Sequence, residues 1–500
     1  MMKKNEWNLR LNVSVPLSKN ILTAKFIRRL ICFLLLTTPS FAFFNSPYKA
    51  VKKTESIWKL PQNIQAITKK EYIKDNIVVK EIQYISSYYK GNPVKIFGYY
   101  CYPKGKQNLP GVAIIHGGGG YAVLSRTINF AKNGYASISI DLPGKGQLRW
   151  KRSRSTGPDM DVPTLLRVEP DISHNYLYHA VPAARCAISF LVQQPQVNKN
   201  KIGMVGLSWG GVITLMVNGT DKRLAAAVPV FGSGWLDHGS TWQARFDEWM
   251  SETDKQTYNK YFDAKNYVTT QHAPLLYMTG SNDHCYYVPN FIKSYLNMPI
   301  GKAKLAIYPN GKHRVTMPML MNIYRFLNHK LRGGNRFPDL TLSEIKDMGN
   351  VIMVPVGYKG PSLAKNVSLW YSQSGISGWT IKKWYQIKAI FHKNKYYINV
   401  PKQIISPEVQ YFITLTDTSG KFVTTPVYSL MRLKTNKRKT LYITTTPIEE
   451  IIYHRISPAA WKKITGKSTD IAGERILFSN LKRIGAKIEI RKNYYYVELP

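Results

Sequence analysis

Three residues whose side chains can together carry out acyl transfer follow one another along the chain: Ser208, Asp283 and His313. Acyl transfer by a serine needs a base that takes the hydroxyl proton, an acid that orients the base, and amides that stabilise the oxyanion. Ser208 is the centre of a Gly-x-Ser-x-Gly motif that runs from Gly206 to Gly210. This spacing is typical of a sharp strand-to-helix turn, with glycines where side chains would collide. The motif also occurs by chance in unrelated chains, so its partners decide the interpretation.

The expected acid and base each follow an apolar run that is typical of a buried strand. Asp283 comes shortly after the run 274–280, and His313 comes shortly after the run 304–308. Carboxyl ends of parallel strands meet at one edge of a sheet, where sites form. We therefore expect Asp283 to orient the base and His313 to be the base.

Each of these two residues has an alternative. Asp237, which follows the preceding strand, is the alternative acid, because the Ser-Asn-Asp segment that ends at Asp283 also suits a simple turn. His284 is the alternative base. It lies directly beside the expected acid, which it could not easily face, so we interpret it as a residue of the pocket rim.

The glycine-rich segment His116–Gly120 follows another apolar run and predicts an oxyanion hole. We expect the backbone amides of Gly118, Gly119 and Trp209 to stabilise the oxyanion, because glycine lets an oxygen approach the amides closely. We interpret His116 as a brace of this loop. A phosphate-binding loop would have Gly-Lys-Ser/Thr or a dinucleotide-binding spacing, and the segment has neither.

Several aromatic residues near these motifs are candidates for a substrate pocket. Tyr121, Trp235 and Trp242 are expected to line it, together with Trp209. Aromatic residues are equally common in hydrophobic cores, so a purely structural role is the alternative.

The elements that must position these residues alternate between strands and helices from about residue 70 to residue 335. This pattern predicts an α/β fold in which a mostly parallel sheet is covered by helices on both faces. An antiparallel pair, 77–82 and 94–100, is expected at the sheet edge, and a helical cap over 235–267. The other expected strands are 111–115, 136–141, 202–206, 224–230, 274–280 and 304–308, and the expected helices are 125–133, 176–193 and 319–331.

From about residue 340 the pattern changes to short strands with turns between them. The segments 367–371, 384–391, 396–400 and 411–415 predict a small all-β sandwich. A short basic α+β unit with a final hairpin at 487–499 is expected after it. The predicted domains are a catalytic domain over 43–339, the sandwich over 340–432 and the basic unit over 433–500.

The first residues of the chain predict export. Seven basic residues precede the apolar run Leu30–Leu36, and small residues follow at Ser40 and Ala42. The run is too short to span a bilayer, so we predict a signal peptide over 1–42 that is cleaved near Ala42. No later apolar run has the length of a membrane span.

Charge and cysteine content narrow the class of protein further. The formal net charge is +41, but the basic residues are spread along the chain rather than gathered in one block, which argues against a nucleic-acid partner. Cys101, Cys186 and Cys285 remain after signal cleavage. An odd number without close spacing predicts free thiols and no zinc site, with one bridge from Cys101 as the alternative.

The motifs taken together resemble the α/β-hydrolase superfamily. The resemblance covers about residues 70–335 and rests on His116–Gly120, Asp141–Gly146, Gly206–Gly211, Gly280–Asp283 and His313. Within the superfamily these motifs are similar to the branch of acetyl xylan esterases, dienelactone hydrolases and prolyl oligopeptidase catalytic domains. The resemblance implies a Ser208 nucleophile, an Asp283 acid, a His313 base, and neither a cofactor nor a metal.

The function expected from the sequence is that of a secreted serine esterase. Its substrate would be a carboxylic ester such as an acetylated polysaccharide. One alternative is a serine peptidase similar to prolyl oligopeptidases. The other is a non-catalytic protein that binds carbohydrate or a cell surface and carries a vestigial hydrolase domain.

Overall fold

The computed structural model describes residues 57–59, 63–145, 153–238, 240–373, 378–393, 395–405, 408–434, 440–444, 487–491 and 494–498. The predicted signal peptide with its cleavage site at Ala42 lies outside these residues, as does most of the predicted basic unit 433–500. All described residues belong to one compact unit.

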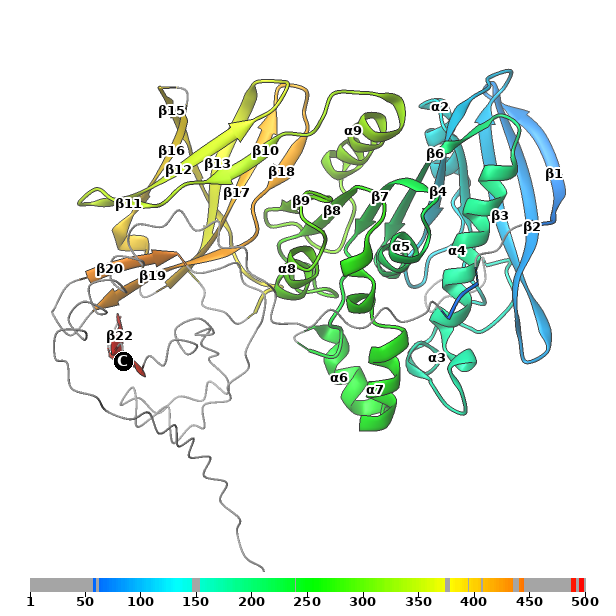
Figure 1. The fold of residues 1–500 in the computed structure, drawn as a ribbon, viewed down its shortest axis with the longest axis horizontal. Coiled ribbons are helices and arrows are strands. Elements are labelled where there is room, and N and C mark those ends of the chain that lie inside the picture. Colours follow the sequence, from blue (N-terminus) through cyan, green and yellow to red (C-terminus); the bar gives the residue numbers. More distant parts are fainter. Residues whose placement is uncertain are drawn as a thin grey trace, which may run out of the picture. The chain divides into compact units, whose positions relative to one another are not determined.

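A large mixed sheet organises the first part of the described chain (Figure 1). Its strands β5, β4, β6, β7, β8 and β9 are parallel, and β1, β2 and β3 form an antiparallel edge that joins β5. In spatial order the nine strands described in this sheet are β1 (Ala66–Lys74), β2 (Ile77–Tyr89), β3 (Asn92–Pro103), β5 (Ala136–Ile140), β4 (Leu109–Ile115), β6 (Val197–Leu207), β7 (Leu224–Val230), β8 (Leu275–Gly280) and β9 (Ala303–Tyr308).

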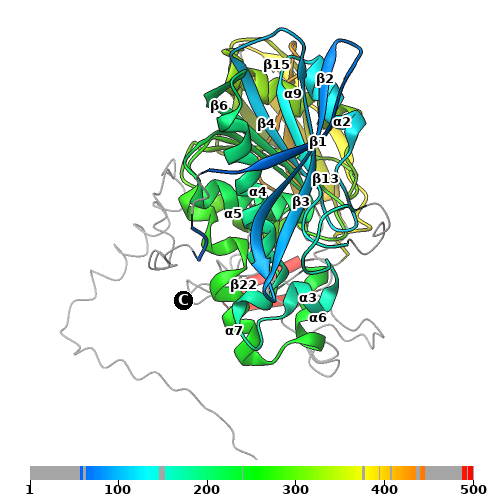
Figure 2. The same ribbon diagram turned by 90° about the vertical axis from the view of Figure 1, so that its right-hand side faces the viewer.

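Helices cover both faces of this sheet, which explains why its central strands are buried and mostly apolar. Every residue of β4, β5 and β8 is buried. Figure 2 shows α2 and α9 on one face, with α4 and α5 on the other. The helices are α2 (Leu124–Lys132), α3 (Val162–Leu166), α4 (Tyr176–Gln193), α5 (Trp209–Thr220), α6 (Thr241–Trp249), α7 (Glu252–Tyr261), α8 (Val288–Leu296) and α9 (Met317–Arg332), with short 3₁₀ turns at Ile172–His174, Ala264–Asn266, Val268–Thr270 and Lys402–Ile404.

Local signals in the sequence account for where several helices start and stop. The Asn175 side chain accepts the amide of Leu177 at the start of α4, and Ser251 with Asp254 forms a capping box at the start of α7. Helix α9 ends at Gly333, whose φ of 74° is left-handed. The expected α/β-hydrolase arrangement, with its antiparallel edge, is confirmed.

Two further sheets form the C-terminal part of the described chain (Figure 1). Their strand pairs are antiparallel, apart from β19 with β22. One sheet contains β10 (Asp339–Leu342), β11 (Lys346–Asp347), β12 (Val351–Lys359), β15 (Ile390–His392) and β16 (Lys395–Pro401). The other contains β13 (Ala364–Ser372), β14 (Tyr385–Lys388), β17 (Glu408–Asp417), β18 (Phe422–Thr424), β19 (Tyr428–Lys434), β20 (Thr440–Thr444), β21 (Lys487–Arg491) and β22 (Tyr494–Glu498).

The C-terminal strands confirm part of the sequence prediction and correct one detail. The hairpin expected at 487–499 is present as β21 and β22. The single strand expected over 384–391 is wrong, because this run divides into β14 and β15, which pair in different sheets. None of the helices in the described ranges combines the length and the apolar character needed to cross a lipid bilayer.

Candidate active site

Ser208 occupies a strained turn between β6 and α5. Its φ of 58° and ψ of −121° lie outside the regions that L-residues prefer, and its amide donates to the Val230 carbonyl at 2.8 Å. A Cβ on Gly206 would lie 1.9 Å from the Gly210 carbonyl oxygen, and a Cβ on Gly210 would lie 2.4 Å from the Ile115 carbonyl oxygen. Both glycines of the motif are therefore required by the close packing of this turn.

Asp283 is a buried carboxylate held by several donors in the loop after β8. One of its oxygens accepts the amides of Cys285 at 2.7 Å and Tyr286 at 3.0 Å. The hydroxyl of Thr279 is 3.3 Å from the other oxygen. Because the side chain is fully buried, these donors orient the carboxylate and balance its charge.

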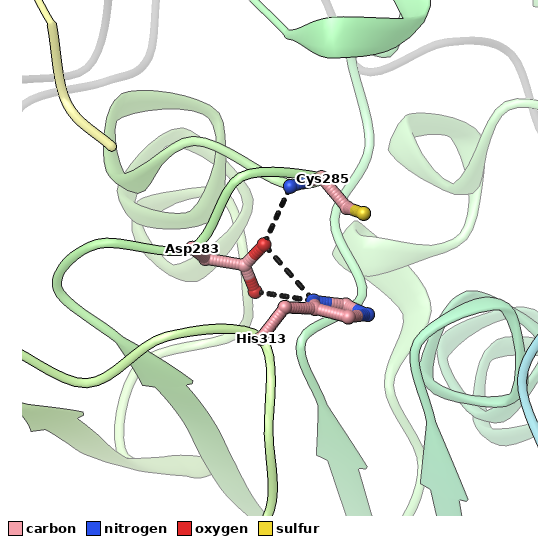
Figure 3. A group of neighbouring side chains, drawn as sticks. All are labelled: Asp283, Cys285 and His313. Carbon is pink, nitrogen blue, oxygen red and sulfur yellow. Dashed lines mark hydrogen bonds and ion pairs between the residues drawn. The ribbon is translucent and has the colours of Figure 1, made fainter. Parts of the chain in front are cut away.

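His313 lies in the loop after β9 and contacts this carboxylate directly. Its Nδ1 is 2.9 Å from one oxygen of Asp283 and 3.0 Å from the other. Figure 3 shows the second ring nitrogen on the side of the imidazole away from Asp283. The imidazole also packs against the ring of Phe231, with the ring centres 4.6 Å apart. The arrangement holds Nδ1 toward the acid and turns the other nitrogen away from it, and the role of this nitrogen as a base stays a prediction.

Tyr286 contacts both the histidine and the serine. Its ring centre is 6.0 Å from that of His313 and 6.4 Å from that of Trp209. Burial raises the pKa of the Tyr286 hydroxyl well above its usual value, and a contact of this hydroxyl with the Ser208 side chain acts in the opposite direction. The hydroxyl nevertheless has no hydrogen bond of standard geometry.

The two halves of the predicted triad are not joined by a hydrogen bond. Among the described residues, none links the Ser208 side chain to His313. Tyr286 lies against both instead. Hydrogen bonds of this kind are often long in the absence of substrate and shorten when it binds.

The glycine-rich loop after β4 lies directly against the serine. A Cβ on Gly117 would be 2.6 Å from the Cβ of Ser208, and one on Gly118 would be 3.3 Å from the Trp209 ring. Within the described residues the amides of Gly118 and Gly119 have no acceptor, so they are available to an oxyanion. Their role and that of the Trp209 amide stay predictions.

His116 is buried at the base of this loop. Its Nε2 accepts the amide of Leu142 at 2.9 Å, and its Nδ1 therefore carries the proton and donates to the Gly117 carbonyl at 2.7 Å. Burial lowers the pKa of His116 to about 4, so the ring is neutral at pH 7. These two hydrogen bonds connect the glycine loop to Leu142, as expected for a residue that holds the loop in place.

The predicted pocket residues differ in where they lie. Trp242 is buried and packs edge-on against Trp209, with ring centres 4.8 Å apart, so it lies beside the turn that carries Ser208. Trp235 follows β7, and the Lys293 ammonium lies 5.1 Å from its ring centre. Tyr121 is half-buried after the glycine loop. The lining roles of these three residues stay predictions.

The alternative acid and base lie in other surroundings. One oxygen of Asp237 lies 3.0 Å from Nδ1 of His238, and the other accepts the Asn259 side-chain amide at 2.7 Å. Burial opposes ionisation of Asp237, but His238 and the nearby Lys265 charge lower its pKa to about 2. His284 is exposed, and its ring centre is 5.4 Å from that of His313; its place at a pocket rim stays a prediction.

A thiol completes the group that surrounds the acid. Cys285 lies near Asp283 and His313 (Figure 3), and one donor atom from each lies within 4.8 Å of the others, a spacing that a metal ion could bridge. The imidazole and the carboxylate already bond to each other. Burial raises the pKa of the Cys285 thiol to about 12, which disfavours the thiolate that a metal requires. Cys101, Cys186 and Cys285 are all free thiols.

Sequence reasoning missed four residues around the site. They are Tyr286, Phe231, Asn282 and Asn310, and the last two flank the acid and histidine through contacts described below. The places of Asn282 and Tyr286 close to Asp283 in the sequence were an available signal, but the contacts of Asn282, Asn310 and Phe231 depend on partners far away in the chain.

Two family models match parts of this chain. A family model for acetyl xylan esterase matches residues 53–235, and a model for the prolyl oligopeptidase family matches residues 172–332. The acetyl esterase Axe7A of Xylanibacter ruminicola is 25% identical over 201 residues, which are 38% of this chain and 46% of that protein. The chain thus spans less than half of the curated relative that it matches.

Solved structures with a similar arrangement include esterases and peptidases. The acetyl xylan esterase of Paenibacillus sp. R4 is 21% identical, with a TM-score of 0.47, and the match covers 54% of this chain and 90% of that one. The acylaminoacyl peptidase of Pyrococcus horikoshii is 17% identical, with a TM-score of 0.39, and the match covers 53% of this chain and 49% of that one.

Proposed function

Because this chain belongs to the α/β-hydrolase superfamily, in the branch of acetyl xylan esterases and prolyl oligopeptidases, we propose that it is a serine esterase. The observation that carries the proposal is the buried Asp283 carboxylate in contact with the imidazole of His313, beside a serine on a strained turn. Such a pair has the chemistry needed to accept a proton from a serine hydroxyl.

In the proposed reaction Ser208 Oγ attacks the carbonyl carbon of the ester while His313 Nε2 takes the hydroxyl proton. Asp283 holds the imidazole through Nδ1 and stabilises its positive charge. The amides of Trp209, Gly118 and Gly119 donate to the oxyanion. The C–O bond to the alcohol then breaks, and the alcohol leaves with the proton from His313. Water attacks the acyl-enzyme by the same route, which releases the acid and restores Ser208.

Tyr286 is a further donor in this mechanism. Its hydroxyl is fully buried, protonated and without a well-formed hydrogen bond, and it contacts the Ser208 side chain. A buried donor without a partner costs free energy, which an oxygen of the substrate would recover. The phenol therefore donates to oxygen atoms that become negative beside Ser208 during the reaction.

The substrate proposed here is an acetyl ester, with acetylated polysaccharide as its natural form. The acetyl xylan esterase match over residues 53–235 supports the acyl group, and the predicted signal peptide supports action outside the cytoplasm. The relative that matches over 201 residues is named as an acetyl esterase, which favours the same chemistry.

A peptidase is the second candidate. The prolyl oligopeptidase model matches residues 172–332, the part of the chain that holds Ser208, Asp283 and His313. An amide would be cleaved by the same residues, with an amine in place of the alcohol as leaving group.

Parallel assays on the whole chain separate these candidates. The parent and Ser208→Ala are incubated with p-nitrophenyl acetate, acetylated xylan and aminoacyl-nitroanilides. We expect the parent to release nitrophenol and acetate but no nitroaniline, and Ser208→Ala to fall by at least about 10⁴-fold, as for nucleophiles of other serine hydrolases. Equal turnover by the two proteins would refute the mechanism, and nitroanilide cleavage without ester cleavage would favour the peptidase.

A further inference from the structure

Two asparagines beside the acid and the histidine bind the same short segment, residues 378–384, which directly precedes β14 and is called the clamp segment. The Asn310 carboxamide donates to the Trp384 carbonyl at 3.0 Å and accepts the Trp384 amide at 3.0 Å. The Asn282 Nδ2 donates to the Lys382 carbonyl at 2.6 Å and contacts the Thr380 carbonyl at 3.4 Å. The two side chains thus form hydrogen bonds with backbone groups of the same segment.

These asparagines are placed to control the catalytic pair. Asn282 immediately precedes Asp283, and Asn310 lies three residues before His313. The two loops are also bonded to each other, since the Asn282 amide donates to the Gly311 carbonyl at 2.8 Å. The acid loop and the histidine loop therefore form one unit, to which the clamp segment is attached from outside.

The clamp segment is itself firmly packed. Trp379 and Trp384 are each only 3% exposed, and the Trp384 ring packs edge-on against Phe412 of β17 at 4.9 Å. The Lys382 ammonium, also buried, lies 4.8 Å from the Trp379 ring centre. The position of the clamp segment is therefore set by the core of the C-terminal sheets rather than by the catalytic loops.

We propose that the C-terminal sheets position the catalytic acid and histidine through the clamp segment, with Asn282 and Asn310 as positioning residues. This inference rests on the proposed function, because it gives the clamp a role in holding Asp283 and His313 in line with Ser208. A misplacement of about 1 Å in such a group costs on the order of 100-fold in rate. The C-terminal sheets are then part of the catalytic machinery, although they supply no reacting atom.

The chain offers a matched control for this proposal. Asn322, on α9, donates to the Phe422 carbonyl at 2.9 Å and accepts the Phe422 amide at 3.0 Å. These are the same two kinds of bond that Asn310 makes to Trp384, but they run from a helix to β18 rather than from a catalytic loop to the clamp segment. Loss of either side chain removes the same two bonds between the α/β sheet region and the C-terminal sheets.

The variants are chosen to avoid backbone strain. Asn310 has a φ of 54°, a conformation that glycine adopts freely, so Asn310→Gly removes the bonds without strain. Asn282→Ala and the control Asn322→Ala are compared with it. Asn310→Asp, which still accepts the Trp384 amide but cannot donate, is the milder second variant if Asn310→Gly unfolds.

The kcat and KM of each full-length variant for p-nitrophenyl acetate are measured beside its melting temperature. We expect Asn310→Gly and Asn282→Ala to lower kcat by about 10- to 100-fold with KM within about twofold, and Asn310→Asp to lie between them and the parent. Asn322 is fully buried whereas Asn310 is exposed, so Asn322→Ala should lower the melting temperature at least as much as Asn310→Gly but keep the parental kcat.

Two different failures can be told apart. Absence of Ser208-dependent turnover in the parent would refute the proposed function. Clear turnover in the parent, with the same kcat in Asn310→Gly, Asn310→Asp and Asn322→Ala, would overturn the positioning role alone. Equal loss of kcat in all three would overturn it too, because the contacts would then serve stability rather than the alignment of Asp283 and His313.

Discussion

Acid should destabilise this protein through His116, the buried histidine under the glycine loop. Its Nε2 accepts the Leu142 amide at 2.9 Å. A second ring proton would sit on Nε2, where it would face the Leu142 N–H and break this hydrogen bond. Burial is the main cause that lowers the pKa of His116 to about 4, from about 6.5 in an unfolded chain. The difference of about 2.5 pH units corresponds to about 3 kcal/mol of stability.

The pH range of this loss follows from the two pKa values. Above pH 6.5 the ring is neutral in both states, and the full contribution is present. As the pH falls below 6.5, the unfolded chain binds a proton that the folded protein does not, so the free energy of unfolding decreases. The decrease is complete below about pH 4 and has a slope of at most about 1.4 kcal/mol per pH unit.

Urea unfolding of the parent and of His116→Gln between pH 7.5 and pH 4.5 measures this effect. Glutamine can place an acceptor near the Leu142 amide but does not titrate. Because other titrating groups are shared, the difference in unfolding free energy between the two proteins isolates His116. We expect the parent to lose about 2.5 kcal/mol relative to the variant over this range, which is a large share of a typical stability. A difference that does not change with pH would refute the assigned tautomer and burial cost.

Three further predictions concern the residues around Ser208. Tyr286→Phe should lower kcat by roughly 10- to 1000-fold, as for other oxyanion donors, while Tyr258→Phe, which removes an equally buried hydroxyl without a partner, should leave kcat unchanged. Equal kcat values for Tyr286→Phe and Tyr258→Phe would contradict the role of the phenol. Gly206→Ala should abolish esterase activity and lower the melting temperature, because its Cβ would lie 1.9 Å from the Gly210 carbonyl oxygen, and a fully active variant would contradict this packing. The alkylation rate of Cys285 by iodoacetamide should rise about tenfold per pH unit from pH 7 to 10, since burial raises its pKa to about 12, and a plateau below pH 9 would exclude this value.

The sequence was most informative where chemistry and strand pattern coincide. The uninterrupted apolar run 111–115 indicated a buried strand and lies within β4, and the helix predicted over 176–193 has those bounds in the structure. Contact between Asp283 and His313 followed from their places after neighbouring parallel strands, although 30 residues separate them.

Other features could not be predicted because they depend on partners that are distant in the chain. Asn282 lies in the motif Gly280–Asp283, but its partner Lys382 is 100 residues away and belongs to no motif, so this bond could not be predicted. The run 384–391 has the pattern of one strand, but its residues pair with two different sheets, which local propensity does not determine. The strands β10 to β12 went unpredicted for the same reason, since their partners fix them.

The central claim, that Ser208 is a nucleophile activated by His313 and Asp283, is tested most directly by locating a covalent adduct. The intact parent, Ser208→Ala, His313→Ala and Asp283→Asn are treated with a fluorophosphonate, and the labelled peptide is mapped by mass spectrometry. We expect one adduct per parent molecule on the peptide that contains Ser208, none at that peptide in Ser208→Ala, and labelling at least about 100-fold slower in the other two variants. A parent that hydrolyses esters but carries its adduct on another residue, or labels equally fast without His313, would contradict the claim.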